Sequence, residues 1–293
     1  MSSTPAVLGD TYPLAGFSVR RVGFGAMQLP GRLVLGPPRD HDQAVAVLRR
    51  AVEAGVNHID TAQFYGPDVA NDLIREALHP YPADLALVTK VGARRDASGG
   101  WPPAQEPRQL REDVEANLRA LGVEQLAAVN LRLPEHHDSP LPPLEDRLGA
   151  LVAMREEGLI AGVGISTASR AEVEQAIAQA DIVCVQNAYS VLNREDEDVL
   201  DLCRGRGVAY VPYFPLGSAF PGRPKVTDDP VVQGIAGRLG ATPAQVGLAW
   251  LLAHDPNILL IPGTSSLDHL EENLAVAALE LTPDDLAALD ALG

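Results

Sequence analysis

An acid, a phenol and an amine stand near the ends of two apolar runs in this 293-residue chain. Asp60 ends the run 56–59, Tyr65 follows five residues later, and Lys90 ends the run 85–89. A free tyrosine has a pKa of about 10 and is a poor proton source near pH 7. A neighbouring ammonium favours the phenolate, and a carboxylate can hold that ammonium in place. Together the three residues could deliver a proton to a carbonyl oxygen that is becoming an alkoxide.

Each of these residues also has an ordinary interpretation. Asp60 could cap a turn, Tyr65 could be a surface aromatic, and Lys90 could be a solvated strand end. However, lysine occurs only at positions 90 and 225, in a chain that otherwise uses arginine. A compact ammonium can shift the proton affinity of a phenol, whereas a guanidinium is a flat fork that stays charged. Taken singly the ordinary interpretations are preferred, but three such residues at neighbouring strand ends favour chemistry.

Short apolar strands alternate with amphipathic helices along the chain. After a predicted hairpin over 12–19, strands are expected at 21–25, 56–59, 85–89, 127–131, 161–165, 182–186, 208–212 and 258–261. Helices are expected at 42–54, 69–78, 108–121, 144–157, 170–179 and 195–205, with a longer one containing 243–253. Near-continuous apolar strands are typical of parallel sheets covered by helices. Eight units predict an α/β fold, a (β/α)8 TIM barrel with an N-terminal β-hairpin and extra C-terminal helices, as one domain over 1–293.

Local signals support these helices. Plausible N-caps are Asp40, Ser169 and Thr242, and Gly55, Gly122 and Gly158 fit the residue after a helix end. The alternative fold is a doubly wound open sheet, because 23–28 resembles the start of a dinucleotide-binding fingerprint. The third glycine is absent there and no helix follows at once, so the barrel is preferred. Two long loops, 92–107 with Trp101 and 133–143, would lie on its catalytic face.

Composition excludes several classes of protein. The net charge of -16 and the pI near 4.7 oppose nucleic acid or an anionic membrane as the main partner. The first residues resemble no signal peptide, and no apolar run approaches the roughly 20 residues that span a bilayer. Cys184 and Cys203 lie within a predicted strand and a predicted helix and are expected to be reduced structural residues. We therefore expect a soluble cytoplasmic protein that acts on a small molecule.

The ordered motifs resemble the aldo-keto reductase family over nearly the whole chain, from 23–27 to 272–273. The resemblance implies that Asp60, Tyr65 and Lys90 form the catalytic group, with Tyr65 as the general acid. The family's fourth catalytic residue is a histidine after the fourth strand, and Arg132 stands at that position. A guanidinium can polarise a substrate oxygen as a fixed cation, but it cannot shuttle protons.

The same resemblance implies a nicotinamide cofactor. Ser166 and Gln186 match the ligands of the nicotinamide amide, and Thr167 replaces the asparagine that is usual after this serine. Tyr213 matches the aromatic that stacks on the nicotinamide ring. The full set of expected cofactor-binding residues is Gly25, Met27, Ser166, Thr167, Gln186, Tyr213, Pro215, Leu216, Gly217, Ile261, Gly263, Thr264, Ser265, Ser266, His269, Glu272 and Asn273. Each could instead be an ordinary residue of the barrel rim, but their order along the chain favours the cofactor.

A hydroxyl-rich loop over 261–266 leads into a helix expected to begin near Leu267. Such a loop binds phosphate well at a helix N-terminus, and barrels often place phosphate there. Similar reductases bind the adenosine 2′-phosphate in this loop, and Glu272 and Asn273 match the family's adenine-side pair. Gly263 and His269 replace the family's lysine and arginine. NADPH is therefore the expected cofactor, with NADH as the alternative.

Within the family, the stretches 36–40, 60–67, 129–132 and 262–266 resemble the bacterial members that reduce pyridoxal. This implies NADPH-dependent reduction of an aldehyde or ketone to the alcohol by direct hydride transfer, with pyridoxal to pyridoxine as the candidate reaction. The alternative is a cofactor-binding regulatory or interaction protein with little turnover, similar to channel β-subunits. A lyase or hydrolase would need paired carboxylates or a metal cluster at strand ends, which the sequence does not show.

Two histidine-containing stretches carry weaker signals. His136, His137 and Asp138 lie in a proline-rich loop with no second cluster of ligands, so a solvated loop is expected there and no metal site. His58 precedes Asp60 within the strand and is expected to point away from the site.

Overall fold

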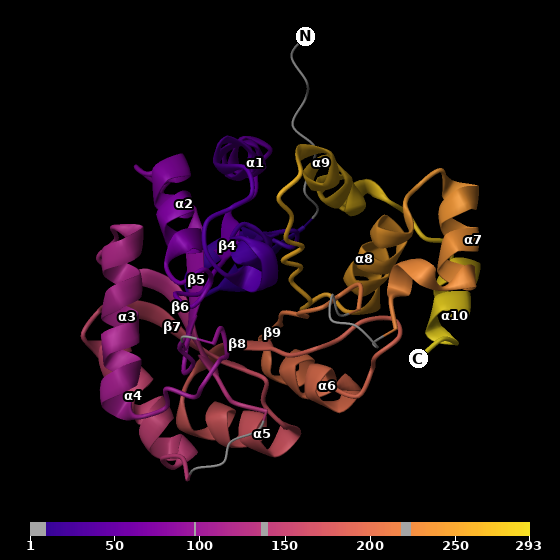
Figure 1. The fold of residues 1–293 in the computed structure, drawn as a ribbon. Helices are drawn as coiled ribbons and strands as arrows, with labels where there is room; N and C mark the ends of the chain where they lie inside the picture. The colour runs from indigo at the N-terminus through magenta and orange to yellow at the C-terminus, as the bar shows by residue number, and fades with distance from the viewer. Residues whose placement is uncertain (1–9, 97, 136–139, 218–223) are drawn as a thin grey trace.

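A curled parallel sheet forms the centre of the protein (Figure 1). The computed structural model describes residues 10–96, 98–135, 140–217 and 224–293. Its seven parallel strands lie side by side in sequence order: β3 (Phe24–Gly25), β4 (His58–Asp60), β5 (Ala86–Val91), β6 (Leu126–Arg132), β7 (Ile160–Ser166), β8 (Ile182–Gln186) and β9 (Ala209–Tyr210). The predicted strands at 182–186 and 127–131 match almost residue for residue, whereas those at 21–25 and 208–212 are shortened to two residues each.

The segment 258–261 closes this sheet into a barrel. It was predicted to be the eighth strand, but it forms isolated parallel bridges, Tyr210 with Ile258 and Val22 with Leu260. The amide of Leu260 also donates to Arg21 O at 2.8 Å, and Leu259 N donates to Tyr210 O at 2.9 Å. One short segment therefore pairs with both edges of the sheet. The predicted (β/α)8 architecture is confirmed, with the last strand reduced to these bridges.

Helices surround the sheet, as Figure 1 shows for α2 to α6. Their bounds are α1 (His41–Glu53), α2 (Val69–Leu78), α3 (Pro107–Leu121), α4 (Leu144–Glu156), α5 (Arg170–Gln179), α6 (Glu197–Arg206), α7 (Pro230–Leu239), α8 (Pro243–His254), α9 (Leu267–Ala275) and α10 (Pro283–Asp290). The side chains of Asp40, Ser169 and Thr242 accept hydrogen bonds from the first turns of α1, α5 and α8, which confirms the predicted N-caps.

The long helix predicted around 243–253 is in fact two helices, α7 and α8. Gly240 ends α7 in the left-handed region at φ 63°, and Thr242 then caps α8 through a capping box with Gln245. A left-handed glycine followed by Thr-Pro breaks one helix and starts another. In Figure 1 α7 lies beside α10, outside the ring of helices around the barrel.

The barrel interior is filled by small side chains and closed at one end by the hairpin. Strands β1 (Thr11–Leu14) and β2 (Phe17–Arg20) pair antiparallel. Leu14 and Val19 of the hairpin pack in one buried cluster with inward residues that include Ala86, Val88, Ala128, Cys184 and Leu259. Both cysteines are buried and free, and burial raises the pKa of each thiol to about 12, as expected of reduced structural residues.

The small residues of this interior give a stability prediction. A Cβ on Gly164 would lie 2.1 Å from Asn130 Oδ1 and 2.7 Å from Cys184 Sγ, whereas one on Gly149, an exposed residue of α4, would meet nothing within 4 Å. Gly164→Ala should therefore destabilise the fold by about 1–3 kcal/mol through overpacking. Gly149→Ala should stabilise it by roughly 0.5–1 kcal/mol through helix propensity. Urea unfolding of the two variants measures both, and equal effects at the two positions would contradict the packing described.

Candidate active site

A buried ion pair stands where β4 and β5 end. Lys90 Nζ contacts Asp60 Oδ1 and also donates to Thr61 O at 3.1 Å. The second oxygen of Asp60 accepts from Gln186 Nε2 at 2.9 Å. Asp60 is 2% exposed and Lys90 5% exposed. Both charged groups are thus removed from water and kept in place by several polar partners.

Tyr65 lies against this pair. Its ring centroid is 5.1 Å from Lys90 Nζ, and the ammonium hydrogen-bonds the phenol. Burial raises the pKa of Tyr65, while the charge of Lys90 opposes that rise. Burial also works to lower the pKa of Lys90, but the charges and hydrogen bonds of Asp60 and Tyr65 together outweigh it, so this pKa is raised. The lysine therefore acts on the phenol in the direction that the sequence predicted, yet burial makes the net pKa of Tyr65 higher and not lower.

A network of buried polar side chains lies between these strand ends and the helices α2 and α3. Thr61 Oγ1 donates to Asn71 Oδ1 at 2.9 Å, and Asn71 Nδ2 donates to Asn117 Oδ1 at 2.9 Å. Thr89 Oγ1 donates to the same oxygen at 2.7 Å, and Asn117 Nδ2 donates to Asp113 O. Because the network joins β4 and β5 to α2 and α3, it fixes the residues beside Asp60 and Lys90 relative to one another.

Arg132 follows at the next strand end. In the sheet it pairs with Ser166, which pairs with Gln186, so the three residues share one level of the barrel. Arg132 is half-buried, and its guanidinium carbon lies 5.6 Å from the centroid of the Trp101 ring. Its charge acts on the phenols of both Tyr65 and Tyr213. The position matched to the family's histidine therefore carries a fixed positive charge beside Tyr65.

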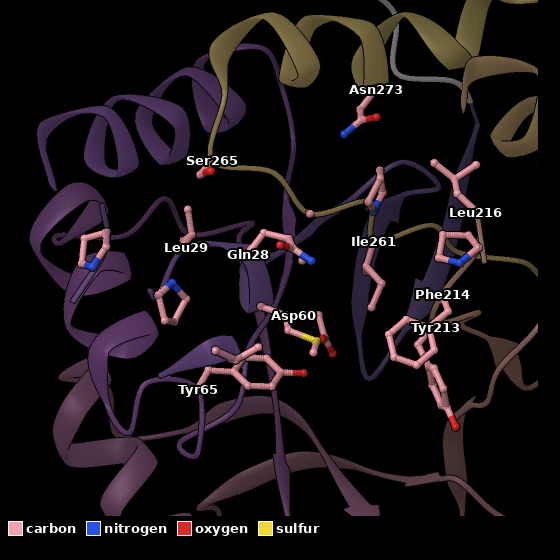
Figure 2. Close-up of a pocket in the computed structure, with 18 of the residues that line it drawn as sticks. Gln28, Leu29, Asp60, Tyr65, Tyr213, Phe214, Leu216, Ile261, Ser265 and Asn273 are labelled. Atoms are coloured by element: carbon pink, nitrogen blue, oxygen red, sulfur yellow. The ribbon is translucent and has the colours of Figure 1, made fainter. Parts of the chain in front are cut away.

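A cleft of about 1140 Å³ runs from Asp60 and Tyr65 to Ser265 and Asn273. Figure 2 shows Tyr65 directing its hydroxyl into this space, with Ser265 and Asn273 on the far side. The residues predicted to bind a cofactor that line the cleft are Gly25, Met27, Gln186, Tyr213, Pro215, Leu216, Gly217, Ile261, Gly263, Ser265 and Asn273. The volume suits a dinucleotide with a small substrate better than a small substrate alone.

The remaining predicted residues lie around the cleft without lining it. Ser166 is buried at the end of β7, and Thr167, in the left-handed region at φ 60°, hydrogen-bonds the Tyr213 side chain. Thr264 Oγ1 accepts from Ser266 N at 3.0 Å, and Ser266 caps α9 by accepting from His269 N. Glu272 O accepts from Gln245 Nε2 at 2.9 Å. The hydroxyls of Thr264 and Ser266 thus serve the start of α9, which begins at Leu267 as predicted.

One side of the cleft was not predicted from the sequence. The segment after β3, including Gln28, Leu29, Leu33 and Arg39, lines it together with Gln43 of α1 and with Phe214. Gln43 Nε2 donates to Ser265 O, which joins α1 to the hydroxyl loop. The signal that could have found this side was the barrel prediction itself, since the loop after every strand converges on the same face.

His58 was predicted to point away from the site, and this is wrong. Residues two apart on a strand point to the same side, so His58 shares the inner side of β4 with Asp60. It is 1% exposed, and burial lowers its pKa to about 4. The stretch 136–138 lies outside the described residues. Among the described residues no group of three or more potential ligands could hold a metal ion, and no helix is long and apolar enough to cross a membrane.

The fold and the cleft agree with a known class of enzyme. The pattern of the aldo/keto reductase family matches residues 21–293, and the chain belongs to this family of NAD(P)H-dependent oxidoreductases. It is 47% identical to pyridoxine 4-dehydrogenase of Escherichia coli (strain K12) over 285 residues, 97% of this chain and 98% of that protein.

Solved structures support the same assignment. A thermostable aldo-keto reductase in complex with the inhibitor epalrestat is 30% identical and superimposes with a TM-score of 0.81 over 97% of this chain and 99% of that one. An aldo-keto reductase from Klebsiella pneumoniae in complex with NADPH is 24% identical and shares the fold, with a TM-score of 0.81 over 97% and 95% of the two chains.

The buried pair predicts a large effect of Asp60→Asn on stability. Removing the carboxylate leaves the Lys90 ammonium buried without its partner, which costs about 3–5 kcal/mol. Burial, the largest influence on the pKa of Lys90, is then opposed only by Tyr65. This pKa should fall below its unfolded value, so the unfolded state binds more protons and stability rises with pH. The deficit measured by urea unfolding at pH 7 should therefore shrink towards pH 10.

The matched control for this prediction is Glu174→Gln. It removes one partner of the exposed Arg170–Glu174 pair on α5, and it should cost less than about 0.5 kcal/mol. A deficit of Asp60→Asn that matches the control, or that does not change with pH, would show that the buried pair is not held as described.

Proposed function

We propose that the protein interconverts an aldehyde and its alcohol with NADPH, and that pyridoxal and pyridoxine are its substrate pair. The observation that carries the proposal is the buried Asp60–Lys90 pair against the Tyr65 phenol at one end of a dinucleotide-sized cleft. The likeness to pyridoxine 4-dehydrogenase of Escherichia coli, at 47% identity over nearly the whole chain, supports this substrate pair.

The roles of the residues follow from their geometry. When bound, NADPH supplies the hydride that adds to the carbonyl carbon. Tyr65, whose raised pKa keeps it protonated at neutral pH, gives the phenolic proton to the carbonyl oxygen. Lys90 stabilises the phenolate that remains, and Asp60 keeps the ammonium charged and aimed at Tyr65. The hydride and the proton together convert the carbonyl to the alcohol.

Arg132 supplies a positive charge to the same oxygen or to an anionic group of the substrate. Within the described residues the guanidinium makes no ion pair, so its charge is available to a ligand. The pyridine ring of pyridoxal carries an acidic hydroxyl beside the aldehyde, which suits a fixed cation. The arginine cannot carry protons back and forth, so proton transfer falls to Tyr65.

The cofactor end of the cleft lacks the family's two cations, at Gly263 and His269, but Arg39 lines the same cleft as Ser265. Arg39 immediately precedes Asp40, the N-cap of α1, and Gln43 of the same helix donates to Ser265 O. The start of α1 is thereby attached to the hydroxyl loop. Arg39 is the residue that would hold the adenosine 2′-phosphate in place of the missing cations.

Arg39→Ala should therefore weaken NADPH binding about tenfold, the loss of one charge-assisted contact to phosphate. NADH binding should be unchanged, because NADH has no 2′-phosphate. Quenching of protein fluorescence on titration with each cofactor measures both affinities. Arg49→Ala is the control, since Arg49 lies on α1 but its side chain donates to Ala77 O. Equal losses for NADPH and NADH would exclude Arg39 from phosphate recognition.

The reaction itself is tested by the loss of NADPH absorbance with pyridoxal. Wild-type protein should consume NADPH, and Tyr65→Phe should lower kcat at least about 100-fold, the usual contribution of a general acid, with cofactor affinity unchanged. Tyr81→Phe is the control, because its hydroxyl donates to Leu121 O, away from the cleft. Tight cofactor binding without turnover of pyridoxal would refute this substrate, and the same result with every aldehyde would favour the regulatory alternative.

A further inference from the structure

Arg95 joins three separate loops around Tyr65. Its Nη2 donates to Leu33 O at 2.9 Å and to Val34 O at 2.7 Å. Its Nε donates to Phe64 O at 3.2 Å, and its Nη1 donates to Gly99 O. One guanidinium therefore gathers four backbone carbonyls, from the segment after β3, from the residue just before Tyr65, and from the loop after β5.

The same guanidinium packs on Trp101, at 4.3 Å from its carbon to the ring centroid. Trp101 in turn lies 6.1 Å from the Tyr65 ring and 5.0 Å from the Phe64 ring, centroid to centroid. The Arg132 guanidinium approaches the same indole at 5.6 Å. Trp101 thus connects Arg95 to both groups that act on the carbonyl oxygen in the proposed reaction.

The segment held by Arg95 has a costly backbone conformation. Leu33 and Val34 both lie in the left-handed region, at φ 60° and φ 58°, and neither is a glycine. This conformation is unfavourable for a residue with a side chain and persists only when the surroundings fix it. Both line the cleft, and Leu33 is 70% exposed, so an apolar side chain stands free at the mouth. Arg95 accounts for how the segment is held in this form.

Arg94 provides the contrast within the same loop. It points to the other side, where its Nε donates to Asp113 Oδ1 at 2.8 Å and its Nη2 to Glu112 Oε2 at 2.9 Å. Two consecutive arginines of similar exposure therefore bind different parts of the protein. Arg94 attaches the loop to α3, and Arg95 attaches it to the residues around Tyr65.

We propose that Arg95 is a positioning residue for substrate selectivity, which holds Trp101 and the 33–34 segment as the two apolar borders of the approach to Tyr65. A flat aromatic aldehyde touches these borders, whereas a short aliphatic aldehyde reaches Tyr65 without them. The borders therefore favour aromatic over small aliphatic carbonyl compounds. This inference rests on the proposed carbonyl reduction at Tyr65, but not on pyridoxal as the substrate.

The test compares kcat/KM for benzaldehyde and propanal in Arg95→Met and Arg94→Met. Arg95→Met should lower the benzaldehyde-to-propanal ratio about tenfold, mainly through a higher KM for benzaldehyde, with NADPH affinity unchanged. Arg94→Met should keep the ratio within twofold even where its melting temperature falls. Arg95→Lys should not restore the ratio, because an ammonium cannot span four carbonyls and stack on an indole. An equal loss for both aldehydes, or an unchanged ratio, would overturn the proposal.

A second readout does not depend on turnover. The chain has two tryptophans, and Trp250 is fully buried, so quenching of fluorescence by acrylamide reports mainly on Trp101. Arg95→Met should raise the quenching constant about twofold and Arg94→Met should not. Unchanged quenching in Arg95→Met would show that Arg95 does not hold Trp101. Wild-type protein that reduces pyridoxal but neither of these aldehydes would overturn the selectivity role alone. Wild-type protein that reduces none of the three, while the difference in quenching persists, would refute the proposed reduction and the selectivity role with it, but not the contact by which Arg95 holds Trp101.

Discussion

The buried ion pair between Lys90 and Asp60 is the constraint on which the site depends. Removing two charges from water costs several kcal/mol for each ion, and attraction compensates only where hydrogen bonds satisfy the remaining polar atoms. That condition is met here, because Lys90 also donates to Thr61 O and Asp60 also accepts from Gln186 Nε2. Since Gln186 belongs to β8, the pair needs the barrel closed around it, and residues 126 positions apart must meet.

Other features of the chain follow from holding these strand ends in register. The hydrogen bonds of the Thr61–Asn71–Asn117–Thr89 network are directional, so they hold the ends of β4 and β5 at one position along the strand direction. Apolar packing alone would not fix that position. Where the segment 258–261 meets β3 and closes the barrel, a Cβ on Gly25 would lie 2.5 Å from Ile261 O. No side chain fits there, so the backbones approach closely beside the cleft. The polar network and this approach together define the rim on which Tyr65 stands.

The sequence predicted those parts of the protein that local chemistry determines. Helix starts at Asp40, Ser169 and Thr242 were readable because a cap acts within four residues, and strand ends were readable because apolar runs stop there. The barrel prediction then placed Asp60 and Lys90 at neighbouring strand ends on one face. The contact of Gln186 with Asp60 was not predicted, because Gln186 was expected only as a ligand of the nicotinamide. The break between α7 and α8 also has a local signal, Gly240 at the end of α7, but the prediction of one long helix did not use it.

Features made by distant segments could not be predicted in the same way. The run 258–261 has the composition of a strand, but its partners allow only isolated bridges. Arg95 looks like any loop arginine, because three of the four carbonyls that it binds are 31 to 62 residues away and backbone acceptors leave no sequence signal. His58 was misplaced although the period of two along a strand would have put it on the same side as Asp60.

The arginine at position 132 changes how the site must work. A histidine at this position could both donate a hydrogen bond and exchange a proton, whereas a guanidinium donates hydrogen bonds and adds positive charge but cannot exchange a proton. Proton transfer then falls on Tyr65, whose pKa is raised by burial and restrained by Lys90. A second cation near the phenol also favours the phenolate that forms when the proton leaves. The substitution therefore separates two tasks, charge stabilisation at Arg132 and proton transfer at Tyr65. It leaves the proton affinity of Tyr65 to the balance between burial, which raises its pKa, and the charge of Lys90, which opposes that rise.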